Sequence, residues 1–116
     1  MDATRRPPKP LVFQILLVLL EKERHGYSIV REIEQQNAGH RRIEAGSLYR
    51  TLRTMLRDGL IRESSRRPDP VHDDHRRRYF TVTELGRAAA AQEARRLDAL
   101  LARARGLRLL DQESGS

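Results

Sequence analysis

Residues 43–61 read IEAGSLYRTLRTMLRDGLI, and this stretch decides the fold that we expect. Leu48, Leu52, Met55 and Leu56 follow the i, i+4, i+7, i+8 spacing of one helix face. The opposite face carries polar residues at the helical spacing i, i+3, i+4, i+7, which are Arg50, Arg53, Thr54 and Arg57. One face can therefore pack on a core while the other presents three guanidinium groups. Such a face suits a DNA groove, but taken alone it also fits an ordinary solvated helix.

The size and charge of the chain limit the kinds of protein that it can be. The chain has 116 residues, a formal net charge of +7 and no cysteine. This length predicts one domain, and at this size folding buries only about two thirds of the surface of the unfolded chain, which favours dimerisation. The basic balance, with a pI near 10.9, indicates a polyanionic partner. The lack of cysteine excludes a disulfide framework and a thiolate site and fits the cytoplasm.

The N-terminus imitates a secretory signal, because Arg5, Arg6 and Lys9 precede an apolar run over residues 11–20. The charged residues 21–24 follow where a small-residue cleavage site would stand. A run of about ten residues is also too short to span a bilayer. We therefore predict a buried helix in a cytoplasmic protein with no membrane segment.

The fold class predicted from these patterns is mainly α with a small β-hairpin, organised as a winged helix-turn-helix with a long C-terminal helix. Thr83 is a good N-cap for that last helix, with Glu84 in its first turn. The expected parts are a basic arm (1–9), helices at 10–24 and 27–36, the arginine-faced helix that stops at Gly59, strands at 60–64 and 78–83, a helix at 84–110 and a tail at 111–116. We expect residues 10–83 to form the DNA-binding domain. The arm precedes it, and the dimerisation helix and the tail follow it.

Several short motifs of this chain resemble the PadR family of bacterial transcriptional regulators, in particular its members with a short C-terminal region. They are HGYSI at 25–29, GSLY at 46–49 followed by Leu52, DGLI at 58–61, and RYF at 78–80 with TELGR at 83–87. The resemblance implies a DNA-binding homodimer, usually a repressor, whose C-terminal helix packs on the partner's N-terminal helix. Two positions depart from the family pattern: Arg50, where the family often has Pro, and Glu44, where it usually has a capping Ser or Thr.

The resemblance places Ser47 and Tyr49 at the DNA-facing end of the recognition helix. Arg53, central on the polar face, is the best candidate for a base edge. Tyr27 and Tyr49 each suit a core position or a hydroxyl contact to phosphate, and Ser47 suits a phosphate contact or its own backbone. Arginines on both sides of the wing, including Arg78, can follow the DNA backbone. The predicted DNA contacts are Tyr27, Ser47, Tyr49, Arg50, Arg53, Thr54, Arg57, Arg66, Arg67, Arg76 and Arg77.

The last predicted helix carries an apolar stripe with spacings of three and four, which is the seam of a helix that packs on another helix. The first helix is apolar nearly all the way round and must be covered on more than one side. Together with the resemblance, these features predict a dimer interface. Its expected residues are Leu11, Ile15, Leu97, Leu100, Leu101, Ala104 and Leu107.

Neither a metal site nor an enzyme is predicted. Residues 72–75 (HDDH) contain metal-ligating types, but adjacent ligands on one loop rarely converge on a single ion. The sequence has no Gly-rich phosphate cradle and no nucleophile with a paired base, so we expect no catalytic residue and no cofactor.

Two alternatives stay open. A basic helical module that docks on a regulatory protein or on RNA would share the charge and the helices, but it would not need an arginine face beside a basic wing. The resemblance also allows a small-molecule effector between the protomers. Only Phe13 among the aromatic residues is placed for the dimer interior, so we do not expect an aromatic-walled pocket there.

Overall fold

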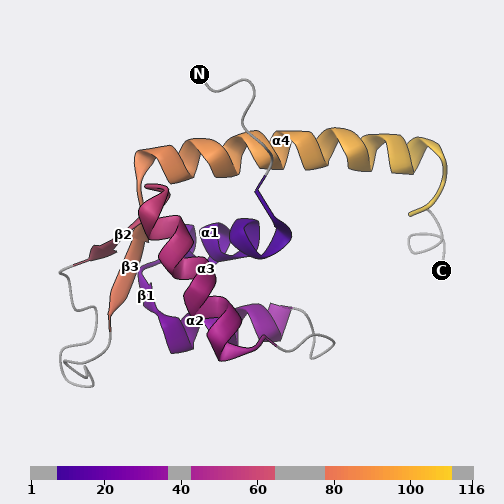
Figure 1. Ribbon diagram of the computed structural model, residues 1–116. Helices are drawn as coiled ribbons and strands as arrows, with labels where there is room; N and C mark the ends of the chain where they lie inside the picture. Colours follow the sequence, from indigo (N-terminus) through magenta and orange to yellow (C-terminus); the bar gives the residue numbers. More distant parts are fainter. Residues whose placement is uncertain (1–7, 37–42, 65–77, 111–116) are drawn as a thin grey trace.

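A computed structural model describes residues 8–36, 43–64 and 78–110 of the chain. Its elements are α1 (Pro10–Glu21), β1 (Arg24–His25), α2 (Gly26–Gln36), α3 (Ala45–Arg57), β2 (Ile61–Ser64), β3 (Tyr79–Val82) and α4 (Glu84–Gly106). Figure 1 shows α1, α2 and α3 gathered beside a small sheet, with α4 running across the top of them. This arrangement confirms the predicted winged helix-turn-helix with a long last helix.

Helix α1 is the central element of the core. Pro10 stands in its first turn, where proline needs no hydrogen-bond partner. Ile15, Leu16, Val18 and Leu19 are buried within the chain, and α2, α3, α4 and β3 all contact this helix. Helix α1 is therefore covered on more than one side, as predicted, and its own chain supplies most of this cover.

The sheet has three strands rather than the two that were predicted. Helix α1 ends at Glu21, not at Arg24, because the backbone at Lys22 is extended. The next residues, Arg24 and His25, then pair with Phe80 and Tyr79 of β3. The strand order is β1-β3-β2, and all pairs are antiparallel. A strand of two residues has no alternating pattern that a sequence could reveal.

The arginine-faced helix α3 packs as its periodicity predicts. Leu48, Leu52 and Met55 are almost completely buried, and they share a cluster with Ile29 and Ile33 of α2. The helix ends before Gly59, whose φ of +80° is a backbone conformation that favours glycine.

Thr83 connects the end of α3 to the start of α4. Its hydroxyl accepts the N–H of Gly86 at 3.0 Å, as expected of an N-cap, and donates to the carbonyl of Gly59 at 2.5 Å. Gly86 lies so close to the carbonyl of Leu60 that no side chain fits there. These contacts fix the direction in which α4 leaves the sheet.

Helix α4 is only partly covered by its own chain. It packs against α1 and β3 near its start and then extends well past α1 (Figure 1). It ends at Gly106 rather than at Leu110, and Arg108 follows with a positive φ of 65°. Leu100, Leu101 and Leu107 are exposed, with 46%, 43% and 70% of their surface open to solvent.

Two residues expected at the dimer interface differ in their surroundings. Leu11 is half-buried, whereas Ile15 is fully buried in the core of its own chain. Ile15 therefore leaves the expected interface, because its side chain has no surface left to offer to a partner. Because α1 is apolar on all sides, the sequence could not show whether Ile15 faces its own core or a partner.

Candidate nucleic-acid interface

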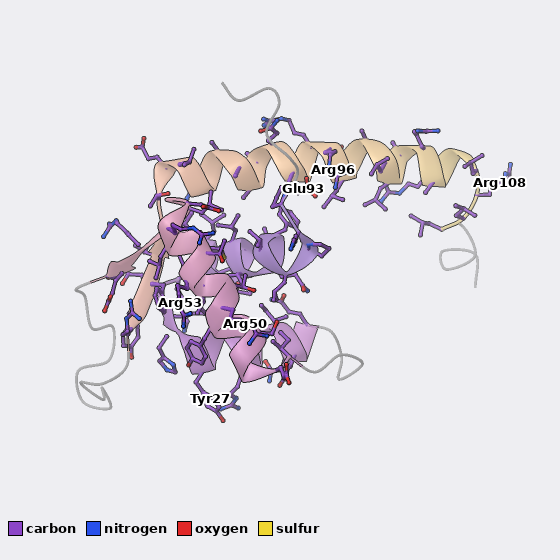
Figure 2. The ribbon with its side chains drawn as sticks, in the orientation of Figure 1. Tyr27, Arg50, Arg53, Glu93, Arg96 and Arg108 are labelled. Atoms are coloured by element: carbon purple, nitrogen blue, oxygen red, sulfur yellow. The ribbon has the colours of Figure 1, made fainter. Side chains whose placement is uncertain are left out.

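The polar face of α3 is open to solvent. Arg50, Arg53, Thr54 and Arg57 are all exposed, while Ser47 at the start of the helix is half-buried. Figure 2 shows Arg50 and Arg53 on α3, on the part of the molecule that lies away from α4. The guanidinium groups of Arg50 and Arg53 have no hydrogen-bond or ion-pair partner among the described residues, whereas Arg57 lies 3.7 Å from the carboxylate of Asp58.

The first turn of α3 is open because Gly46 has no side chain. A Cβ built on Gly46 would lie 3.4 Å from Nη1 of Arg50, so the Arg50 guanidinium reaches back toward the N-terminal end of the helix. This direction is the usual one for long side chains on a helix. An incoming group can therefore approach the helix backbone closely beside a cationic side chain.

The hydroxyl groups on α3 are partly used within the helix. Thr54 donates to the carbonyl of Arg50 at 3.2 Å, and Thr51 donates to the carbonyl of Ser47 at 2.9 Å. The Thr54 hydroxyl can still accept a hydrogen bond, and its methyl group is available for an apolar contact.

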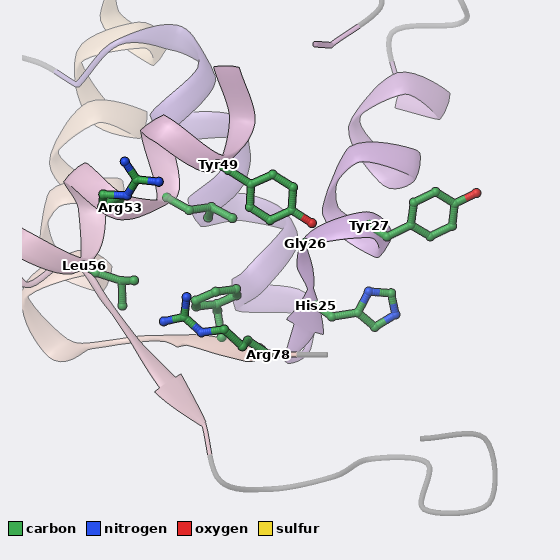
Figure 3. Close-up of a pocket in the computed structure, with 9 residues that line it drawn as sticks. His25, Gly26, Tyr27, Tyr49, Arg53, Leu56 and Arg78 are labelled. Carbon is green, nitrogen blue, oxygen red and sulfur yellow. The ribbon is translucent and has the colours of Figure 1, made fainter. Parts of the chain in front are cut away.

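Helix α3 forms a ridge between two hollows. The wing-side hollow lies between α3, the start of α2 and β3, and it has a volume of about 430 Å³ (Figure 3). It is lined by His25, Gly26, Tyr27, Tyr49, Leu52, Arg53, Leu56, Arg78 and Phe80. The α1-side hollow has a volume of about 600 Å³ and is lined by Pro8, Lys9, Val12, Ser47, Arg50, Thr51, Thr54, Asp58, Leu60 and Ala89.

The two tyrosines predicted at the interface both lie at the rim of the wing-side hollow. Tyr49 is 47% exposed and Tyr27 is 59% exposed. The Tyr27 ring stacks beside His25 and lies under the guanidinium of Arg31, at 5.7 Å. Neither tyrosine is a core residue, since about half of each is exposed.

Two guanidinium groups line the wing-side hollow from different elements: Arg53 from α3 and Arg78 from the chain just before β3 (Figure 3). Arg78 is held in place. Its Nε and Nη2 donate to the same oxygen of Glu63, at 3.1 and 3.0 Å, and its guanidinium lies 5.4 Å from the centre of the Phe80 ring. Glu63 stands opposite Phe80 in the β2–β3 register.

His25 closes one side of the same hollow. Its Nδ1 accepts the N–H of Ser28 at 3.2 Å, which caps the first turn of α2. A nitrogen that accepts a hydrogen bond carries no proton, so this contact requires the neutral ring. His25 also contacts the Tyr79 ring edge-on.

The predicted wing contacts Arg66, Arg67, Arg76 and Arg77 lie outside the described residues, as does the HDDH cluster at 72–75. In the ranges that the structure does describe, no three His, Cys, Asp or Glu residues are grouped so as to hold a metal ion. The same ranges contain no helix that is both long and apolar enough to cross a membrane.

Three residues near these hollows were missed at the sequence level. They are Lys9, His25 and Glu63. Lys9 is basic and stands next to Pro10, which is a weak signal. The place of His25 and Glu63 depends on which strands pair, and the sequence pattern did not contain that information.

The sequence pattern of the Transcriptional regulator PadR-like family matches residues 15–92 of this chain, which include the second part of α1, all of α2, α3 and the sheet, and the start of α4. The chain belongs to the PadR-like family of transcriptional regulators. Membership confirms the resemblance, and it confirms that the chain is a transcriptional regulator and not an enzyme.

Individual relatives agree with this assignment. A transcriptional regulator of Mycobacterium tuberculosis is 32% identical over 80 residues, which cover 69% of this chain and 68% of that protein. An uncharacterized protein of Lysinibacillus sphaericus is 31% identical over 74 residues, covering 64% of this chain and 65% of that protein. Each match thus spans about two thirds of the relative's length. The crystal structure of Bacillus subtilis PadR in complex with operator DNA is similar in fold, with a TM-score of 0.60, 18% identity, and coverage of 72% of this chain and 46% of that chain.

Proposed function

We propose that this PadR-like regulator is a homodimeric repressor that binds a roughly two-fold symmetric DNA operator. The observation that carries the proposal is the exposed face of α3, where Arg50 and Arg53 have no protein partner among the described residues. A net charge of +7 favours a polyanion at this surface. The similar fold of Bacillus subtilis PadR, solved with operator DNA, supports the same choice of partner.

In this proposal α3 lies in a major groove, and the two hollows beside it face the sugar–phosphate backbones that border the groove. Lys9 and Ser47 line the hollow on one side of α3, and Arg78 with Tyr49 lines the other. Arginine, hydroxyl and ammonium groups are the usual donors to phosphate oxygens. The wing arginines at 66, 67, 76 and 77 keep their proposed role along the adjacent backbone.

We assign base reading to Arg50 rather than to Arg53. In helix-turn-helix complexes the N-terminal residues of the recognition helix contact the base edges. Arg50 is one turn nearer that end than Arg53, and its guanidinium lies over Gly46. Arg50 and Arg53 each line a hollow with a second cation, Lys9 and Arg78 respectively, so the place of Arg50 nearer the N-terminal end of α3 is what favours it for a base edge.

The proposed dimer is held by the second half of α4. Leu100, Leu101 and Leu107 are exposed there, and Leu97 and Ala104 on the same side are half-buried. An exposed apolar stripe of this spacing is suited to a helix of a second copy, and a two-fold dimer uses the same surface of both chains. Leu11 of α1 remains a proposed contact. Two such protomers would place their α3 helices in half-sites about 34–36 Å apart, or at a multiple of that distance.

A small-molecule effector is a further part of this proposal, and its proposed site is the α1-side hollow, where it would compete with the DNA backbone. The volume of about 600 Å³ is in the range of small-molecule sites. Residues of α1, α3 and α4 meet there, so a bound compound would contact the recognition helix and the dimerisation helix at once. Lysate fractions that raise the melting temperature of the wild type, but not of an Ala89→Trp variant, would identify such a compound.

The test of the function is to sequence the DNA fragments that the purified full chain retains from the source genome. We expect a recurring, roughly palindromic motif, and we expect that unlabelled motif DNA competes much better than random DNA. Equal competition by both, or preference for RNA over duplex DNA, would favour the basic interaction module instead.

A further inference from the structure

The Glu63–Arg78 pair is unusual for a surface that is to bind DNA, because a carboxylate beside phosphate groups is repulsive. Both side chains are about half exposed, with 49% and 58% of their surface open to solvent. Exposed ion pairs add little to folding stability. The stability of the sheet therefore does not account for an acidic residue at this place.

The geometry assigns a different role to the acid. Two bonds from Arg78 to one oxygen of Glu63, together with the Phe80 ring beside the guanidinium, restrict the rotamers of Arg78. Phe80 itself is only 3% exposed, so the ring is a fixed surface. Arg78 is thus held at the wall of the wing-side hollow before any ligand arrives.

The other cation of the hollow has no such partner. Arg53 has no ion pair or hydrogen bond within the described parts of the chain, and no acid lines the hollow with it. With Arg53 and Arg78 at +1 each and Glu63 at −1, the net charge of this group is +1. A hollow with two guanidinium groups, one of them uncompensated, and the Tyr49 side chain beside them matches the oxygens of a phosphodiester group (Figure 3).

We propose that Glu63 is a positioning residue for DNA binding, which holds Arg78 in place so that Arg78 and Arg53 bind one backbone phosphate in the wing-side hollow. The proposal rests on the proposed function and adds to it a specific phosphate site and the role of an acid. Holding Arg78 in place favours DNA binding through entropy, because an arginine that is already ordered loses less rotamer freedom on binding.

This role predicts the sign of a substitution. If Glu63 acted only through its charge, Glu63→Gln would tighten DNA binding by removing a repulsion. If Glu63 positions Arg78, Glu63→Gln weakens binding, because the amide oxygen accepts from a guanidinium more weakly than a carboxylate does and no longer holds Arg78 in place. The expected loss is roughly two- to tenfold per protomer, which is the cost of ordering one long side chain. The two readings therefore differ in direction and not only in size.

The test measures binding of the full chain to a random-sequence DNA duplex, because a phosphate contact does not depend on sequence. Four proteins are compared: the wild type, Glu63→Gln, Arg78→Ala and the double variant. We expect Glu63→Gln to weaken binding with a nearly unchanged salt slope, since both arginines remain. Arg78→Ala should weaken it more and lower the slope by about one per protomer.

The double variant provides the decisive comparison. Without Arg78, Glu63 is an unpaired acid facing phosphate, so adding Glu63→Gln to Arg78→Ala should tighten binding. The effect of the same substitution thus reverses its sign. Asp98→Asn on α4 is the matched control, since Asp98 is an exposed acid without a partner among the described residues. It should leave affinity unchanged, and all variants should melt like the wild type.

Tighter or unchanged binding by Glu63→Gln in the wild-type background would overturn the positioning role, as would a double variant weaker than Arg78→Ala. A wild type that binds no duplex at all would instead overturn the proposed function. These outcomes are separate, because the first two require a wild type that binds DNA.

Discussion

The ring of Tyr49 lies directly on Gly26. A Cβ built on Gly26 would stand 2.6 Å from the Tyr49 hydroxyl oxygen and 2.8 Å from Cε1. Glycine at this position therefore lets the start of α2 approach α3. The two residues come from two of the motifs that carry the family resemblance, HGYSI and GSLY, so these motifs contact each other in the fold.

Replacing Gly26 by Ala should weaken DNA binding without unfolding the chain. The added methyl group would displace the Tyr49 ring, which is the far end of a partly exposed side chain and can move aside. Although Gly26 is buried, the free energy of unfolding should change by less than about 1 kcal/mol, because the group that must move is the end of the Tyr49 side chain and not the backbone. Thermal melting and binding to duplex DNA measure the two effects separately.

The control for this prediction is the same substitution in a Tyr49→Leu background. Without the ring, Gly26→Ala should have no further effect on DNA affinity. An equal loss of affinity in both backgrounds would show that Tyr49 is not the reason for glycine at position 26.

Much of the fold could be predicted because periodicity and caps are local signals. The burial of Leu48, Leu52 and Met55 and the exposure of Arg50, Arg53 and Arg57 follow from helical spacing alone. The capping role of Thr83 was visible in the same way, since it needs only the neighbours of one residue.

The rest of the site depends on contacts between residues far apart in the sequence. Strand β1 has two residues and exists only because β3 pairs with it. Arg78 meets Glu63 because the register of β2 and β3 brings them together, and no spacing rule gives that register. The burial of Ile15 within its own chain could not be predicted for a similar reason, since a helix that is apolar on all sides does not reveal which side its own chain covers.

The dimer prediction concerns α4. Changing both Leu100 and Leu107 to Glu should give a monomer, because each dimer would bury four unpaired carboxylates on an apolar seam. The monomer should also bind the operator more weakly. Analytical ultracentrifugation at micromolar concentration measures the state directly.

Ala102→Glu is the matched control for the dimer. Ala102 is exposed on the same helix, on the side opposite Leu100 and Leu107, so its substitution should leave a dimer. A wild-type monomer, or a dimer that survives the double leucine substitution, would contradict the proposed interface.

The Glu93–Arg96 pair of α4 predicts a pH dependence of stability. Glu93 is only 5% exposed, and two hydrogen bonds from Arg96, at 2.8 and 2.7 Å, lower the pKa of its carboxyl group while burial opposes them. A pKa that is lower in the folded state stabilises the fold above the unfolded value of about 4.3, and this contribution is lost as the pH falls through the folded pKa.

We therefore expect the wild type to lose melting temperature on acidification below about pH 4.3, where Glu93 begins to take up a proton in the unfolded chain. Glu93→Gln should melt at a lower temperature than the wild type at neutral pH, and its melting temperature should fall less on acidification. Thermal melts at a series of pH values measure this difference, with Asp98→Asn as the control for a general charge effect. Parallel curves for wild type and Glu93→Gln would contradict the assignment.

DNA binding should depend steeply on salt. The wing and α3 of two protomers neutralise on the order of six to eight phosphates, which gives a slope of log K against log salt between about −5 and −7. Replacing Arg77 by Ala should reduce the slope by about one per protomer. Arg95→Ala, an exposed arginine of α4, should leave it unchanged. A wild-type slope near zero would rule out the DNA-binding surface.

The sharpest comparison is between Arg50 and Arg53, which are both exposed on α3 and one turn apart. Arg50→Ala should cost about 1–3 kcal/mol on the operator and relax the preference at one base pair of each half-site. Arg53→Ala should weaken operator and random DNA alike and lower the salt slope by about one per protomer. Titrations of both variants with operator, single-base variants of the operator and random duplex, each at several salt concentrations, separate these effects.

The two substitutions are controls for each other, because each removes the same group from the same helix. Their difference lies in their surroundings: the Arg50 guanidinium lies over Gly46 at the N-terminal end, and Arg53 shares the wing-side hollow with Arg78. If Arg53→Ala relaxed a base preference and Arg50→Ala did not, α3 would lie in the groove with its middle deepest, as the sequence alone predicted. If both variants lost affinity equally on all DNA sequences, α3 would contact only the sugar–phosphate backbone of the DNA. The base preference would then come from another part of the chain.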